Sequence, residues 1–142
     1  KEIPQIREWE SPAFDINIWV KSVREVILEV KPPKNNYSFD FQIAGLSWPD
    51  AHFDLVFSDA LSDDAIQAMN ERIGNFVNGW NEQEEQNGQE DFIHNMLDMR
   101  RTDEKSYEVL IDFGSASELS LLKFLDFLQE IGGDKLLTVA LS

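Results

Sequence analysis

His52 is the residue whose neighbours most suggest chemistry. Asp50 and Asp54 flank it at two residues on either side, and in a strand the three side chains would point to one face. An imidazole between carboxylates can act as a general acid or base near neutral pH, or can ligate a metal ion. The alternative is the solvated face of an amphipathic strand, because the intervening positions of the segment 52–58 are apolar. We favour this alternative and expect no catalytic residue here.

The second histidine, His94, has Glu90 four residues before it and Asp98 four residues after it. On a helix this spacing would place three metal ligands in a row. Zinc prefers a tetrahedral set completed by a further ligand, and the chain has no HExxH-type signature. We therefore interpret these residues as exposed polar side chains, and expect neither a metal nor a cofactor.

The net charge of −15 is concentrated in one part of the chain. Residues 35–99 hold thirteen acidic side chains and one basic side chain, Arg72, whereas residues 1–34 hold six of each. A negative field repels phosphate backbones and anionic lipids, and it speeds the approach of a basic protein. The charge therefore predicts a basic protein partner, no direct nucleic-acid binding and no membrane binding.

The most acidic stretch is NGWNEQEEQNGQEDF, residues 78–92, which has five carboxylates and no Lys or Arg. Its polar residues and Gly88 are typical of an exposed helix end followed by a loop. It would complete an acidic surface if the fold brought the end of strand 52–58 close to it. The predicted partner-binding residues are Trp48 as an exposed aromatic anchor, with Asp50, Asp54, Asp59, Glu82, Glu84, Glu85, Glu90 and Asp91.

Hydrophobic periodicity predicts the elements that position these residues. Alternating apolar residues indicate strands at 14–20, 35–45, 52–58, 106–113 and 135–141. Helical spacing indicates helices at 22–30, about 62–81, 91–99 and 115–131, although the β-branched residues of 22–30 leave a strand as the alternative there. We expect the strands 35–45 and 52–58 to form an antiparallel hairpin.

This pattern predicts an α+β fold in a single globular domain, residues 1–142. The expected order is β-α-β-β-α-(α)-β-α-β, with a core similar to the split βαββαβ arrangement. A mixed sheet of about five strands would carry its helices mainly on one face.

Cellular location is only weakly constrained by the sequence. The chain has no cysteine, no apolar run of about 20 residues that could span a bilayer, and no signal-peptide core near its start. We expect a cytoplasmic protein; the alternative is an exported, processed form that begins at Lys1.

In size, acidity, lack of cysteine and expected single α+β domain, the chain resembles the immunity proteins of bacterial polymorphic-toxin and contact-dependent inhibition systems. The resemblance implies a non-enzymatic inhibitor that covers a basic partner such as a toxic nuclease. Two other hypotheses stay open. One is a small-ligand-binding or regulatory α+β domain, and the other is a hydrolase that uses Asp50, His52 and Asp54.

Overall fold

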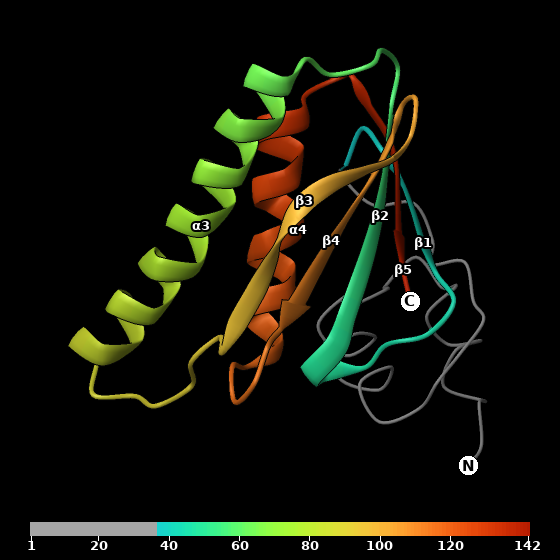
Figure 1. Cartoon of the computed structure of the whole chain (residues 1–142). Helices are drawn as coiled ribbons and strands as arrows, with labels where there is room; N and C mark the ends of the chain where they lie inside the picture. Colours follow the sequence, from blue (N-terminus) through green and yellow to red (C-terminus); the bar gives the residue numbers. More distant parts are fainter. Residues whose placement is uncertain (1–36) are drawn as a thin grey trace, which may run out of the picture.

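The computed structural model describes residues 37–142, which form a five-stranded sheet with two long helices (Figure 1). The strands are β1 (Asp40–Ile43), β2 (Ala51–Phe57), β3 (Asn95–Asp103), β4 (Ser106–Asp112) and β5 (Leu136–Leu141). The helices are α3 (Asp63–Gln86), α4 (Glu118–Gly132) and the short 3-10 helix η1 (Trp48–Asp50). The predicted α+β class and mixed five-stranded sheet are confirmed. The predicted elements at 14–20 and 22–30 lie outside the described residues.

The strand order across the sheet is β1-β5-β2-β4-β3. The pair β1 and β5 is parallel, and the other neighbouring pairs are antiparallel. The predicted hairpin between the segments 35–45 and 52–58 is therefore wrong, because β5 lies between β1 and β2 and pairs with both. The strand β5 is thus an internal strand of the sheet, next to the central strand β2.

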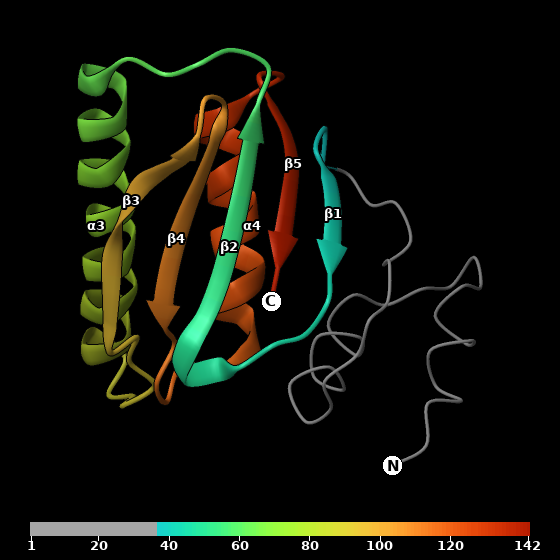
Figure 2. The same cartoon turned by 45° about the vertical axis from the view of Figure 1, so that its right-hand side comes forward.

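Both long helices lie on the same side of the sheet, which is seen most clearly in Figure 2. The sheet meets them with the apolar positions of each strand, and in β2 the buried residues alternate with half-buried ones as predicted. Phe124 of α4 contacts Phe53 of β2 edge-on, with ring centroids 4.9 Å apart. Burial of these aromatic and aliphatic side chains is the main force that holds the helices on this face.

Helix α3 begins and ends at clear local signals. The Ser62 hydroxyl accepts a hydrogen bond from the Ala65 amide at 3.1 Å, which caps the first turn. At the other end Gly88 has a φ of 71°, and the Gln89 amide donates to the Glu84 carbonyl at 2.8 Å. These contacts form a Schellman-type ending. The helix therefore extends to Gln86, beyond the predicted end near Asn81.

Residues 91–99 do not form the predicted helix. Strand β3 occupies Asn95–Asp103 and makes a hairpin with β4, with register irregularities between Leu97 and Arg100 and between Arg101 and Asp103. These irregularities break the period-two alternation that normally reveals a strand. The apolar residues at 92, 93, 96 and 97 consequently mimic helical spacing.

None of the helices among the described residues combines the length and apolar character that crossing a membrane requires.

Candidate functional site

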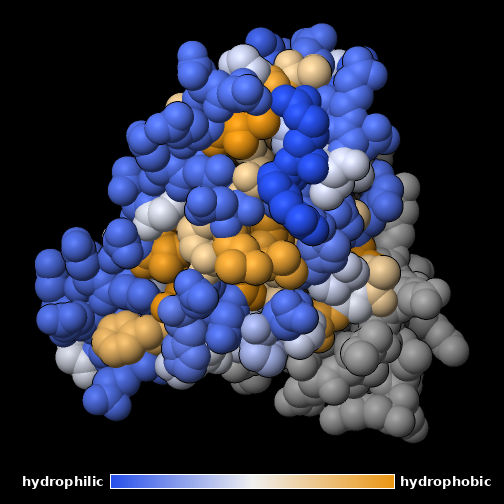
Figure 3. All heavy atoms as spheres, viewed as in Figure 1, coloured by the Kyte–Doolittle hydropathy of each residue, from blue (hydrophilic) through white to orange (hydrophobic). Residues whose placement is uncertain are grey.

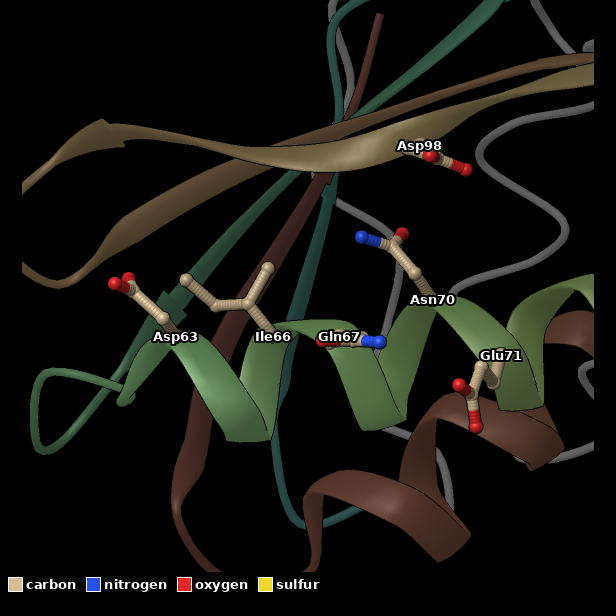
Figure 4. Close-up of a pocket in the computed structure, with 6 residues that line it drawn as sticks. All are labelled: Asp63, Ile66, Gln67, Asn70, Glu71 and Asp98. Carbon is tan, nitrogen blue, oxygen red and sulfur yellow. The ribbon is translucent and has the colours of Figure 1, made fainter.

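Helix α3 runs beside the edge strand β3, and the line where they meet is hollowed in two places. We call this the α3–β3 seam. The first hollow has a volume of about 460 Å³, and Figure 4 shows the residues that line it. They are Asp63, Ile66, Gln67, Asn70 and Glu71 of α3 and Asp98 of β3.

The second hollow lies further along the same seam, near the end of α3, and has a volume of about 450 Å³. Its lining residues are Asn78, Asn81, Glu82, Glu85, Phe92, Ile93 and His94. Together the two hollows are lined by five carboxylates and by no Lys or Arg.

Two asparagines fasten β3 to α3 along the seam. The Asn70 side chain accepts from the Met99 amide at 2.6 Å and donates to the Met99 carbonyl at 3.1 Å. Asn81 makes the same pair of bonds with Ile93, at 2.8 Å and 2.9 Å. An edge strand has unpaired backbone groups, and these side chains satisfy some of them. The walls of the seam are therefore held at a fixed spacing.

The carboxylates of the seam have no cation among the described residues to neutralise them. Arg72, the one basic residue of α3, is 3.6 Å from Glu130 of α4 instead. No described Lys or Arg forms an ion pair with Glu82, Glu84 or Glu85. Figure 3 shows that mostly hydrophilic residues cover α3 on this face of the molecule.

The position of these three glutamates opposes helix stability. They lie in the last turns of α3, where the helix dipole presents partial negative charge, and the last turn holds no basic residue. Acids are favourable in the first turn, where Asp63 and Asp64 are found. The glutamates therefore cost folding stability at a site where a bound cation would relieve them.

The loop after α3 holds the remaining acids of the 78–92 stretch. The Glu90 carbonyl accepts from the Ser115 hydroxyl at 2.9 Å, and the Asp91 carbonyl accepts from Trp80 Nε1 at 2.9 Å. The backbone of both residues is thus attached to the rest of the fold. Glu90 is exposed and Asp91 is half-buried.

The other predicted binding residues lie elsewhere. Trp48 is 7% exposed, stacks on Phe113 with ring centroids 4.6 Å apart, and donates from Nε1 to the Ala116 carbonyl at 3.0 Å. It is a core residue, so its prediction as an exposed anchor is wrong. Asp59 follows the far end of β2, beside the start of α3, and is remote along that helix from the 82–91 acids.

Asp50 and Asp54 are also separated from the seam. Asp50 ends η1, so it is not in the strand with His52, and it helps to line a smaller hollow of about 190 Å³ with residues of β3 and β4. Asp54 lies in β2 on the sheet face opposite the helices, together with His52. The expected row of Asp50, His52 and Asp54 on one strand face is therefore wrong at Asp50.

A polar cluster does form around His52, with a residue that the sequence did not single out. Glu108 of β4 stands directly opposite Asp54 in the antiparallel register. His52 Nε2 is 2.9 Å from Glu108 Oε2 and 3.3 Å from Asp54 Oδ1. The other Glu108 oxygen accepts from Arg100 Nε of β3. The signal in the sequence was an acid at an interior position of the otherwise apolar run 107–111.

The cluster is partly shielded from water. The Glu108 side chain is 11% exposed, whereas those of His52 and Asp54 are 32% and 48% exposed. The hydrogen bond from Arg100 lowers the pKa of Glu108, and His52 adds to the effect, while burial opposes it. Glu108 is therefore held as a carboxylate.

His94 is not part of a helical row of ligands. Its Nδ1 is 3.8 Å from an Asp112 oxygen, and its ring lies against Gly114, where a Cβ atom would come within 2.2 Å. Gly114 has a φ of 52°, so both the backbone and the histidine ring require glycine there.

Comparison of the chain with protein-family models, with curated proteins and with solved structures gave no match in any of the three.

Proposed function

We propose that this protein is a non-enzymatic binding protein that docks a basic protein partner onto the α3–β3 seam. One observation carries the proposal: two adjacent hollows are lined by five carboxylates and by no Lys or Arg. A partner that inserts Lys or Arg side chains there would supply the missing cations.

The seam suits long basic side chains for three physical reasons. Its carboxylates can form charge-assisted hydrogen bonds with ammonium and guanidinium groups. Apolar lining residues, Ile66 in one hollow and Phe92 in the other, can contact the aliphatic stems of the same side chains. Because α3 and β3 are joined through Asn70 and Asn81, little ordering is needed on binding.

The class of partner follows from its charge. A protein with a positive groove for phosphates would meet the acids of the seam as it meets a nucleic acid. A small inhibitor of a toxic nuclease, of the immunity-protein kind, is the function that we propose on this basis together with the overall character of the sequence. Inhibition would result from covering the groove.

The test begins with affinity capture from the lysate of the source organism by the tagged full-length chain. Glu82, Glu84 and Glu85 are changed together to Gln, which removes three charges from the end of α3, two of them (Glu82 and Glu85) from the lining of the second hollow. The matched control removes three exposed charges that line neither hollow, through D59N, E104Q and D134N. Both variants have the same net charge, so any difference between them reflects position.

We expect one basic protein to be retained near one-to-one by the wild type and by the control, and to be lost as salt rises. The seam variant should retain little of it. Retention by the seam variant at the level of the control would contradict the seam as the docking site. Retention of a neutral or acidic protein in a manner insensitive to salt would contradict the charge argument itself.

A further inference from the structure

The cluster on the open face of the sheet has ligand groups at metal-coordination spacing. One atom each from His52, Asp54 and Glu108 lies within 4.8 Å of the other two. His52 and Asp54 are two residues apart on β2, and Glu108 is the cross-strand partner of Asp54. The backbone of the sheet therefore sets the separation of all three.

The distances from His52 Nε2 to the two carboxylate oxygens match those between neighbouring ligand atoms of a small divalent cation. Bonds of about 2.1 Å to nitrogen and oxygen place neighbouring ligands about 3.0 Å apart at 90° and about 3.4 Å apart at the tetrahedral angle. His52 Nε2 lies 2.9 Å from Glu108 and 3.3 Å from Asp54. Asp54 is the most exposed of the three side chains, so it can rotate to complete the set.

Neighbouring groups orient these side chains, as the hydrogen-bond partners of the ligands do in metal sites. Arg100 donates to one oxygen of Glu108, which leaves the other oxygen facing His52. The Ser142 hydroxyl is 3.5 Å from His52 Nδ1, the ring nitrogen that faces away from the carboxylates. A metal ion on Nε2 would place the imidazole proton on Nδ1, where the hydroxyl can accept it.

We propose that His52, Asp54 and Glu108 form a binding site for one divalent transition-metal ion, with Zn²⁺ as the ion that best suits one imidazole and two carboxylates. The imidazole favours zinc over magnesium and calcium, which prefer sets made only of oxygen. The ion takes the place of the direct contact between His52 Nε2 and Glu108 Oε2. Three protein ligands leave a fourth position for water.

Metal binding is measured by isothermal titration calorimetry, with ZnCl₂ added to chelator-treated full-length protein near neutral pH. Wild type should bind one Zn²⁺, and Mg²⁺ at the same concentration should give no saturable signal. D54N should weaken Zn²⁺ binding by at least about tenfold, since even loss of an outer contact weakens metal sites by that factor. D50N is the matched control and should bind as the wild type does.

A second readout identifies the ligand directly. The chain contains two histidines, so the ¹⁵N NMR resonances of the two imidazoles are simple to assign. Zn²⁺ should shift Nε2 of His52 and leave His94 unchanged. Equal binding by D54N and wild type, a shift at His94 alone, or no saturable binding would each overturn the proposal. Partner capture by the seam needs no metal, so either proposal can fail without the other.

Discussion

The α3–β3 seam and the cluster around His52 are both built from carboxylates, but their charges are handled in opposite ways. In the cluster, Glu108 accepts from Arg100 and lies 2.9 Å from His52. In the seam, Glu82 and Glu85 line a hollow with no described cation to pair with them. One group of acids is paired within the fold, and the other has no cation partner among the described residues.

The comparison shows that acid content alone does not locate a binding surface. Acids near His52 are held by cross-strand pairing, which fixes their neighbours, and the hydrogen bond from Arg100 lowers the pKa of Glu108. Acids of the seam lie at the end of α3 that the helix dipole disfavours. Position relative to cations and dipoles therefore separates acids without a described cation beside them from acids that are paired within the fold.

The largest expected effect on folding comes from breaking the frame of the seam. Asn81→Ala removes two hydrogen bonds to Ile93 and leaves the buried backbone of that residue without partners. We expect a loss of about 1–3 kcal/mol in the free energy of unfolding, measured by urea denaturation. Asn78→Ala is the matched control, because Asn78 is an exposed residue of the same helix. Similar losses in both variants would show that Asn81 does not hold the seam.

A smaller effect, largest at neutral pH and lost in acid, should mark the cluster. Because the pKa of Glu108 is lowered in the folded state, its contribution to stability is present above the ordinary pKa of 4.5. That contribution is lost as the pH falls through the lower folded-state pKa. Glu108→Gln should therefore reduce the melting temperature at neutral pH and flatten its decline in acid.

The matched control for this prediction is Glu104→Gln in the exposed turn between β3 and β4. Melting temperatures are followed by circular dichroism from neutral pH to a pH of about 3. The control should keep the acid decline of the wild type. If the melting temperature of Glu108→Gln fell in acid as steeply as that of the wild type, the charge of Glu108 would not contribute to folding stability.

The smallest expected effect is a gain in folding stability when charged residues are neutralised. Changing Glu82, Glu84 and Glu85 to Gln should stabilise the protein by about 0.3 kcal/mol for each charge removed, because the charges oppose the helix dipole. Asp64→Asn, at the favourable end of the same helix, should destabilise it by a similar amount. Urea denaturation at low salt resolves the two signs. Destabilisation by the glutamine changes would contradict the inference that these glutamates lower the stability of the fold.

Elements whose apolar residues recur with a regular period could be predicted from the sequence. Strand 52–58 and the helix starting near Ser62 follow from alternation and from a capping residue, and both are present. Strand β3 was missed because its register irregularities break the alternation. The insertion of β5 between β1 and β2 was not predicted, because pairing between residues 79 to 88 positions apart leaves no local pattern.

The candidate site was also predictable only where it depends on residues close together in the sequence. The acidic stretch is local, so Glu82, Glu84 and Glu85 were identified from composition. Glu108 was not, because its relation to His52 depends on the register of β2 against β4. Trp48 was misjudged because its position before Pro49 resembles an exposed turn, whereas its ring fills the core against Phe113.

The association rate of the captured basic partner tests the central claim most directly. Stopped-flow measurements at low and moderate salt would compare wild type, the E82Q/E84Q/E85Q variant and the D59N/E104Q/D134N control. We predict that the seam variant associates at least about tenfold more slowly at low salt, and that the control stays close to wild type. Equal slowing in both variants would mean that only the net charge matters, and would contradict the α3–β3 seam as the docking surface.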